Sequence, residues 1–506
     1  MTDAPRPAPA SRRLLRAALL LIGAAAACAQ GPPRAWDVRA FGAAGDGTRL
    51  DSAAVNAAVA ACARAGGGTV TVPRGTYLCG TVFLLGNVTL ELRRGATLLA
   101  SPDLGDYRSV GRSTEGRSSA LIIAEGRENV GIVGEGTIDG NGRSFVFQPR
   151  QPHPAGFFDA AATRQGSAFF QRNQEDRDGP DRMRNRPGIL ALFLECRNVT
   201  LRGFTVVDAP NWCLHLACCR HAELSGLTVR NSLRIPNADA IDLASSRDVR
   251  VSGCTLEAGD DGIAISPCAD GYRSAVAQDI TVSRCVITSR SAGIRLGWAA
   301  RDIRRVRFDH IAIRGSNRGI GIFVRGRESI EDVSFSDVTI DTHLVDGAWW
   351  GLGEPVHISV APYLSGGPLG RVRGIRFKDV TSVGEGPVVL YSSGPGGISD
   401  VTFERCSLAV RRSPLDAYYG GNLDLRPILP AALGITGRGL SAVLAVNVDA
   451  LRMRGLSVSW LGGPSPYFAA ALEADGCRGA DLGGFEGRGP RPGAPAIVED
   501  GLARAP

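Results

Sequence analysis

The chain has 506 residues, of which 44% are hydrophobic and 21% charged, so it can bury a large core and does not have the composition of a disordered chain. Its 65 glycines and its 6% of aromatic residues favour many tight turns and small stacked side chains. Residues 1–29 carry four arginines and one aspartate, and without them the formal charge of +7 falls to 7 − 3 = +4, too low to indicate a nucleic-acid partner.

The first 29 residues are predicted to be a signal peptide. Arg12, Arg13 and Arg16 accompany a short apolar run that ends in Ala27-Cys28-Ala29, a small-x-small cleavage signature. The segment SRRLLR leaves a twin-arginine signal open, and Cys28 leaves a lipoprotein anchor open. We expect an exported protein, periplasmic or extracellular, that is monomeric and has no membrane span in the mature chain.

Residues 51–65 form the clearest amphipathic helix of the sequence. Val55, Val59 and Cys62 fall on one helical face, Asp51 or Thr48 can cap its start, and three glycines follow it. A single helix of this kind, ahead of several hundred residues of strand pattern, is expected to cover the open apolar end of a solenoid.

After this helix, one strand pattern recurs: x-Φ-x-Φ-x-x-Φ, where Φ is an apolar residue. Segments such as DVRVSGC and DITVSRC carry it, and the pattern starts near residues 198, 221, 248, 279, 305, 332, 374, 400 and 450. Most steps are 23 to 31 residues long, and the longer steps leave room for an insertion or an extra coil. A period near 27 built of strands predicts an all-β fold, a single right-handed parallel β-helix over residues 36–500 with an N-terminal capping helix.

The repeat also separates the 12 cysteines into groups. Three of them fill the last apolar position of the pattern and are predicted to be buried rungs of the core: Cys254, Cys285 and Cys406. Cys62 with Cys79, and the adjacent Cys218 and Cys219, are better candidates for disulfides in an exported protein. No group of histidines and cysteines has the spacing of a metal site, so neither a metal nor a cofactor is expected.

Two segments interrupt the repeat and are predicted to be loop insertions. Residues 143–186 are polar, charged and proline-containing, and residues 343–359 include the sequence AWWGLGEPVHIS. Long loops of a solenoid gather over one face and build a binding cleft.

Three aspartates between these loops suggest chemistry. Asp260 follows Asp239 by 260 − 239 = 21 residues, about one coil, so Asp239 is expected beside Asp260 and Asp261 on neighbouring strands. Carboxylates packed so closely repel one another, which favours a mixture of protonated and ionised groups. That mixture is what acid–base hydrolysis of a glycosidic bond requires, and side chains on adjacent rungs can reach the separation typical of inversion.

With these motifs the chain resembles glycoside hydrolase family 28, the polygalacturonase-like pectinases. The resemblance covers most of the mature chain and includes FGAAGDGTRLDSAAVNAAV, the run of residues 186–215, NADAID and GDDGIAI. It implies a right-handed parallel β-helix of the pectin lyase fold, with Asp260 as general acid and with Asp239 and Asp261 activating the water. The family's Asn-x-Asp motif also matches Asn237, which is expected near the substrate.

Other family motifs are changed. The family's Gly-His-Gly corresponds to Ser291-Ala292-Gly293, and its Arg-Ile-Lys to Gly321-Ile322-Phe323, so the histidine and the two cations that would meet a galacturonate carboxylate are missing. Ser266 stands where a lysine often follows the paired aspartates. The cleavage residues are retained while the acid-sugar contacts are not, which indicates a different sugar beside the cleaved bond or a loss of activity.

Several residues could take over contacts to the substrate. Three arginines lie near the altered motifs: Arg295, Arg318 and Arg325. Four residues of the second insertion offer an aromatic face or polar groups: Trp349, Trp350, Glu354 and His357. For the arginines the alternative is an ordinary surface position, and for the tryptophans an anchor that holds the loop to the solenoid.

The sequence therefore predicts an exported glycosidase that cleaves a pectin-like or related polysaccharide or oligosaccharide without a metal, by inversion. A polysaccharide lyase of the same fold is an alternative, and it would need calcium ligands or a base near a uronic acid. A non-catalytic carbohydrate-binding β-helix is the other alternative.

Overall fold

The computed structural model describes residue 1 and residues 35–114, 117–149, 181–268, 276–298, 301–345, 349, 351–362, 366–416, 425, 439–500 and 502–504. Trp36–Pro506 form one compact unit, and Met1–Ala35 form another. The predicted signal peptide, with Cys28, lies outside the described residues apart from Met1. No helix in the described residues is long and apolar enough to cross a membrane.

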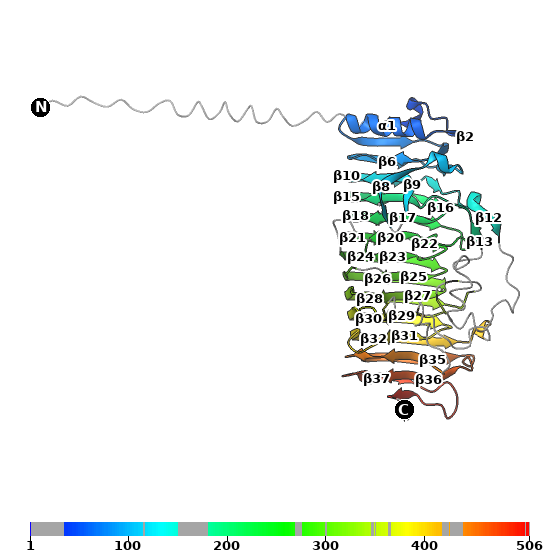
Figure 1. The fold of residues 1–506 in the computed structure, drawn as a ribbon, viewed down its shortest axis with the longest axis vertical. Helices are drawn as coiled ribbons and strands as arrows, with labels where there is room; N and C mark the ends of the chain where they lie inside the picture. Colours follow the sequence, from blue (N-terminus) through cyan, green and yellow to red (C-terminus); the bar gives the residue numbers. More distant parts are fainter. Residues whose placement is uncertain are drawn as a thin grey trace. The chain divides into compact units, whose positions relative to one another are not determined.

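The unit Trp36–Pro506 is a stack of coils in which a strand pairs in parallel with the strand one coil later (Figure 1). The described strands form one sheet of fifteen strands, one of twenty-two and one of two. Between Ala277 and Arg411, two faces of the coil are joined in single strands of 13 to 14 residues, such as β24 (Ala277–Ser289) and β26 (Ile303–Ser316). The predicted right-handed parallel β-helix is confirmed.

The fifteen-stranded sheet consists of β5 (Val82–Phe83), β8 (Arg108–Thr114), β9 (Arg117–Glu125), β14 (Ile189–Leu194), β17 (Trp212–Ala217), β20 (Ile241–Ala244), β23 (Ile263–Ser266), β25 (Ala292–Gly297), β27 (Arg318–Val324), β29 (Val356–Val360), β31 (Val388–Ser392), β33 (Leu440–Val446), β36 (Phe468–Asp475), β38 (Ile497–Glu499) and β39 (Leu502–Arg504).

The twenty-two-stranded sheet consists of β1 (Ala35–Asp37), β2 (Asp46–Leu50), β3 (Gly68–Val72), β4 (Gly75–Cys79), β6 (Val88–Leu92), β7 (Ala96–Ala100), β10 (Glu128–Gly134), β11 (Thr137–Asp139), β15 (Arg197–Arg202), β16 (Thr205–Val207), β18 (Arg220–Ser225), β19 (Thr228–Arg230), β21 (Arg247–Ser252), β22 (Thr255–Ala258), β24, β26, β28 (Ser329–Thr342), β30 (Arg371–Gly384), β32 (Ile398–Arg411), β34 (Val448–Asp449), β35 (Arg452–Leu461) and β37 (Asp481–Gly487). Three short 3-10 helices complete the elements: η1 (Val38–Phe41), η2 (Leu104–Asp106) and η3 (Gly142–Phe145).

The apolar pattern of the sequence is the inner lining of the coils. Phe308, Phe335, Phe377 and Phe403 are register partners on successive strands, and their ring centroids are 4.8, 5.1 and 4.8 Å apart. None of the four rings is more than 3% exposed. Each coil therefore fills the core by stacking its side chain on the equivalent side chain of the next coil. The distance between them is the one that strand pairing imposes.

The predicted capping helix is α1 (Ser52–Arg64), which packs against β3, β5 and β6 at the start of the β-helix. Val55, Val59 and Cys62 are fully buried on its inner face, as predicted. Asp51 occupies the N-cap position but makes no side-chain capping bond, because its carboxylate accepts the N–H groups of residues 44 and 45. Thr48 lies in β2 rather than at the cap, so that alternative is wrong.

The cysteine predictions divide. Cys254, Cys285 and Cys406 are buried rungs, as predicted. The proposed disulfides are wrong. Cys62, Cys79 and Cys219 are unbonded thiols buried in the core, and the Sγ atoms of Cys218 and Cys268 lie 3.3 Å apart, well beyond the S–S bond length of about 2.05 Å.

The two predicted insertions are described only in part. The ends of the first are joined by an antiparallel pair, β12 (Val146–Pro149) with β13 (Asp181–Met183), and the residues between them lie outside the described ranges. The second follows β28, but its last residues belong to β29, so they are strand rather than loop. An insertion before a strand hides the start of that strand, because it breaks the regular repeat.

Candidate active site

A glycine corner opens successive strands of the fifteen-stranded sheet. A Cβ atom at Gly262 would lie 2.3 Å from Cγ2 of Ile287, and one at Gly319 would lie 2.6 Å from Cγ2 of Ile340. Gly293 takes the same position on the strand between them. These corners face the core with no room for a side chain, so the residue before each glycine is delivered to the outer face of the sheet.

The register of the sheet then stacks these outer residues in one column. Ile241 pairs with Ile263, Ile263 with Ile294, and Ile320 follows on β27. Val356 of β29 continues this row of register partners. The residues two positions before each member of the row form the outer column, which contains Asp239, Asp261, Ala292, Arg318 and Glu354. Asp260 lies one position earlier than Asp261, in line with Ala238.

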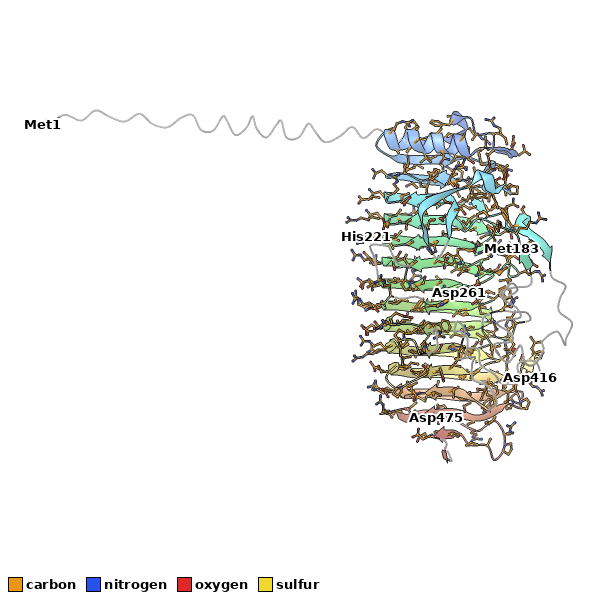
Figure 2. The ribbon with its side chains drawn as sticks, viewed as in Figure 1. Met1, Met183, His221, Asp261, Asp416 and Asp475 are labelled. Carbon is orange, nitrogen blue, oxygen red and sulfur yellow. The ribbon has the colours of Figure 1, made fainter. Side chains whose placement is uncertain are left out.

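Asp239, Asp260 and Asp261, named here the carboxylate cluster, meet as the sequence predicted. One carboxylate oxygen of each lies within 4.8 Å of the others. The three residues are 3%, 8% and 3% exposed. The main chain fixes the stacking, because the N–H of Ala240 donates to the carbonyl of Asp261 at 3.0 Å. Figure 2 shows Asp261 among the middle coils, between the capping helix and Asp475.

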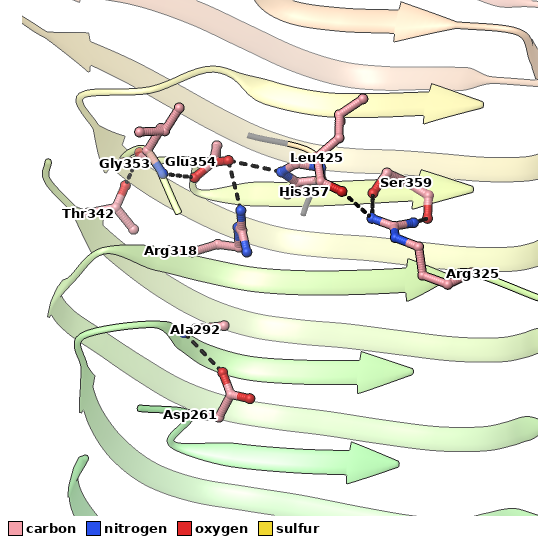
Figure 3. Close-up of polar contacts among 11 residues, drawn as sticks. Asp261, Ala292, Arg318, Arg325, Thr342, Gly353, Glu354, His357, Ser359 and Leu425 are labelled. Atoms are coloured by element: carbon pink, nitrogen blue, oxygen red, sulfur yellow. Dashed lines mark hydrogen bonds and ion pairs between the residues drawn. The ribbon is translucent and has the colours of Figure 1, made fainter. Parts of the chain in front are cut away.

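Both oxygens of Asp261 receive donors from the next coil. The backbone N–H of Ala292 donates to Oδ1 at 3.2 Å (Figure 3), and Nε of Arg295 donates to Oδ2. The Arg295 side chain is 14% exposed and that of Asp261 is 5% exposed, so the ion pair is largely shielded from water. Arg295 therefore binds a residue of the carboxylate cluster directly.

Two buried side chains that the sequence did not reveal brace the turns of the cluster. Ser289, at the end of β24, donates its hydroxyl to the carbonyl oxygen of Asp260. Asn231 donates to the carbonyl of Ala238 at 3.1 Å and to that of Asp239 at 3.4 Å. Both lie outside the family motifs and belong to ordinary strand ends, so the sequence carried no signal for them.

Asn237 is held from the other side. Arg186, the last residue of the first predicted insertion, donates to the carbonyl of Pro236 at 2.9 Å and faces Oδ1 of Asn237 at 3.3 Å. Asn237 has a left-handed backbone, with φ of 55°. The residue therefore shapes the turn that leads to Asp239, and Arg186 is a further residue that the sequence reading missed.

A buried polar pair also lies on the outer face near Asp239. His215 is the register partner of Asp242, and its Nδ1 is 3.8 Å from Oδ2 of that aspartate. The ring of Trp212 stacks on the imidazole, with centroids 5.1 Å apart. The outward position of His215 within the run NWCLHLACC follows from strand alternation, because Leu214 and Leu216 on either side of it face the core, and that was the available signal.

Arg318, Glu354 and His357, named here the buried ion-pair cluster, lie farther along the same column (Figure 3). Oε1 of Glu354 accepts Nη2 of Arg318 at 3.1 Å and Nδ1 of His357 at 2.9 Å. Arg318 is 2% exposed and the other two residues are fully buried. His357 belongs to β29, which corrects the expectation that it is a loop residue, whereas Glu354 lies in the loop two residues before β29, as expected.

The electrostatics of this cluster favour one protonation state. Burial raises the pKa of Glu354, but the Arg318 guanidinium and the His357 hydrogen bond outweigh it and hold that pKa well below its usual value. Burial, together with the charge of Arg318, lowers the pKa of His357 to about 4. At neutral pH the cluster thus holds one carboxylate, one guanidinium and one neutral imidazole.

Phe323, which was expected to correspond to the family's lysine, has two arginines beside its ring. The guanidinium carbons of Arg318 and Arg325 lie 5.0 and 5.3 Å from its ring centroid. Arg325 is 4% exposed and donates to Ser359 Oγ at 2.7 Å and to the carbonyl of Leu425 at 3.1 Å. Two of the predicted replacement cations are therefore used inside the protein.

The tryptophans of the second insertion are only partly described. Trp349 is 4% exposed, a burial that agrees with an anchor for the loop. Trp350 lies outside the described residues. Of the predicted site residues, the structure therefore brings the three aspartates and Arg295 together, and it places Arg318, Glu354, His357 and Arg325 in a separate group.

Within the described residues, two groups of side chains are close enough to share a cation: the carboxylate cluster, and Asp309 with His310 and Asp337 on the exposed face of the other sheet. The carboxylate cluster has the more chemically useful arrangement, because its oxygens converge on the outer face of the sheet. Oxygens of this kind can pass a proton to a leaving group and activate a water.

A sequence model of the family described as "Glycosyl hydrolases family 28" matches residues 62–346, which is more than half of the chain. A "Probable polygalacturonase" of Vitis vinifera is 29% identical over 245 residues, which cover 46% of this chain and 44% of that protein. The chain thus spans less than half the length of this curated relative.

Solved structures share the fold. The family 28 exopolygalacturonase of Yersinia enterocolitica aligns with a TM-score of 0.63 at 17% identity, covering 90% of this chain and 78% of that one. An exopolygalacturonase from Thermotoga maritima aligns with a TM-score of 0.60 at 21% identity, covering 75% and 88%. At these identities the likeness concerns the β-helix itself.

Proposed function

The chain belongs to glycosyl hydrolases family 28, and from this premise we propose that it hydrolyses O-glycosidic bonds of a pectin-type polysaccharide or oligosaccharide. The observation that carries the proposal is the carboxylate cluster, where successive coils bring three aspartates within 4.8 Å. The names of its relatives suggest the substrate class, since the Vitis vinifera protein is described as a probable polygalacturonase.

In the proposed reaction, Asp260 protonates the glycosidic oxygen as the bond to the leaving sugar breaks. Asp239 and Asp261 hold a water, and one of them takes its proton as the oxygen attacks the anomeric carbon. Asp260 is the most exposed of the three, at 8%, which suits the acid that must reach the leaving group. Asp261 already receives the Arg295 guanidinium, an arrangement that suits the ionised role.

We propose from the family resemblance that the reaction inverts the configuration of the anomeric carbon. The nearest oxygens of the cluster lie within 4.8 Å of one another, closer than the roughly 6.5–9.5 Å that typifies inverting enzymes and nearer to the roughly 5–5.5 Å of retaining ones. Inversion therefore requires the water to use the more distant oxygens, whereas retention would require one aspartate to bond to the sugar. The anomer of the first product distinguishes the two mechanisms.

The sugar beside the cleaved bond is proposed to differ from the one that the family's altered motifs would bind. Ala292, Gly321 and Phe323 replace residues whose charges would meet a galacturonate carboxylate. We also propose that the protein acts after export, with residues 1–29 as its signal, and that its catalysis needs no metal.

The test uses the mature protein with polygalacturonate, a carboxyl-reduced polygalacturonate and other pectic polysaccharides. Release of reducing ends, with the product anomer followed by NMR, should occur in the wild type and fall by about a thousandfold in Asp260→Asn. The control is Asp248→Asn, because Asp248 lies in β21 of the other sheet, with φ of 55° and a 52% exposed side chain that pairs with His221.

Other outcomes would replace the proposal. A chelator-sensitive reaction that gives an unsaturated, absorbing product would indicate a lyase. Glycan binding that survives Asp→Asn changes at all three aspartates, without any release of reducing ends, would indicate a carbohydrate-binding protein.

A further inference from the structure

Arg295 is fixed on the outer face by strand alternation. Its neighbours Ile294 and Leu296 are fully buried in the core, so the side chain between them points to the face that carries the carboxylate cluster. In the sheet, Arg295 lies between Ala264 and Gly321. Both neighbours are small, and the ring of Phe323 fills the space beside Gly321, where a Cβ atom would lie 2.6 Å from that ring.

The guanidinium of Arg295 connects the carboxylate cluster to the end of its own strand. Its Nε binds Oδ2 of Asp261, and its Nη1 donates to the carbonyl of Gly297 at 2.9 Å. With the N–H of Ala292 on Oδ1, Asp261 is held at both oxygens by donors from β25. A carboxylate held at both oxygens cannot rotate freely, so its orientation toward a bound water is set by β25.

Two substitutions relative to the family pattern accompany this contact. Ala292 stands at the position of the family's histidine, next to Asp261 in the column, and its methyl group leaves space there. Gly321 stands at the position of the family's first cation, and it pairs in register with Arg295 one coil earlier. One arginine thus occupies the neighbourhood of two lost polar residues.

We propose that Arg295 is a positioning residue for Asp261, which holds this carboxylate in a fixed orientation within the carboxylate cluster. The proposal rests on the proposed function. The guanidinium offsets part of the repulsion among three crowded carboxylates, and it orients the carboxylate that activates the water. Arg295 contacts the aspartate rather than the sugar, so its loss should impair turnover more than binding.

The first test compares Arg295→Met with Arg295→Lys in the mature protein, on a substrate that the wild type cleaves. We expect kcat to fall about a hundredfold in Arg295→Met with KM changed less than about threefold, and we expect Arg295→Lys to recover about tenfold of that loss. The control is Arg305→Met, which removes an arginine that pairs with Asp279 at 2.7 Å on the exposed face of the other sheet. A wild-type kcat in Arg295→Met, or a change confined to KM, would overturn the inference.

A second test does not need a substrate. Urea unfolding midpoints of Arg295→Met, Asp261→Asn and the double variant form a cycle that reports the interaction of the two side chains. We expect the two single shifts to sum to clearly more than the shift of the double variant. Additive shifts would refute the pairing even if no substrate were cleaved, whereas a proposed function that is wrong would appear as wild-type turnover no faster than Asp260→Asn.

Discussion

Two groups of charged side chains lie along the fifteen-stranded sheet, and they differ in how their charges are matched. In the carboxylate cluster, three acidic groups lie within 4.8 Å of one another. In the buried ion-pair cluster, one carboxylate lies between a guanidinium and an imidazole, and all three residues are at most 2% exposed. The same sheet thus carries a group of mutually repelling carboxylates on one pair of coils and a charge-matched carboxylate on another.

The difference in charge matching indicates which of the two groups takes part in catalysis. Like charges that are forced together cost stability, and the fold tolerates them where a proton must be moved. Glu354 is instead matched by the buried Arg318, so the removal of either partner should cost stability. Changes in the first group should therefore alter rate, and changes in the second should alter unfolding.

The largest expected effect is on rate. Asp239→Asn should lower kcat by about a thousandfold, because it removes a carboxylate that holds the water. The free energy of unfolding should stay the same or rise, since one of three repelling charges is lost. Rates together with urea unfolding measure both, and a variant that is both active and less stable would end the distinction between the two groups.

The next effect is on stability. Glu354→Gln should lower the free energy of unfolding by about 3 kcal/mol, because it leaves the buried Arg318 without its counter-charge. The folded fraction should keep kcat within about threefold of the wild type, as no described contact joins Glu354 to the carboxylate cluster. A large loss of kcat without a loss of stability would place Glu354 at the substrate.

A smaller effect depends on pH. The pKa of His357 is about 4 in the folded protein and close to 6.5 when unfolded, so the unfolded chain binds the extra proton between these values. Stability should therefore fall as pH falls, by about 2 kcal/mol between pH 6.5 and pH 5 from this residue alone. The groups facing the imidazole are Glu354, Arg318, Arg325 and the ring of Phe323. Urea unfolding of His357→Gln should show a shallower dependence than the wild type.

The smallest effect belongs to the exposed face. Arg305→Met breaks a pair with Asp279 whose side chains are 46% and 43% exposed, and it should change the unfolding free energy by less than about 1 kcal/mol. A thermal shift larger than that of Glu354→Gln would show that exposure does not separate the two kinds of ion pair.

The sequence could predict the carboxylate cluster because coil length alone decides it. Asp239 and Asp261 lie 22 residues apart, and their strands pair directly, so no knowledge of side-chain conformation was needed. The repeat likewise predicted the apolar lining and the cysteine rungs.

The remaining features depend on properties that a repeat does not encode. The step of 36 residues from Ile320 to Val356 conceals a strand start, which is why His357 looked like a loop residue. The contact between Arg295 and Asp261 depends on the conformation of the arginine side chain, which the repeat does not determine. The disulfide candidates failed because proximity in sequence and proximity of sulfur atoms are unrelated in a coil.

In the phenylalanine stack, the distance between neighbouring rings does not depend on the number of residues that separate them in the sequence. Steps of 27, 42 and 26 residues join Phe308, Phe335, Phe377 and Phe403, yet the rings remain 4.8 to 5.1 Å apart. A segment added between coils therefore leaves the spacing of the interior unchanged. For protein engineering, the β-helix is therefore a scaffold in which loops can be exchanged to alter what the outer face binds. The stacked rings would keep the coils in register.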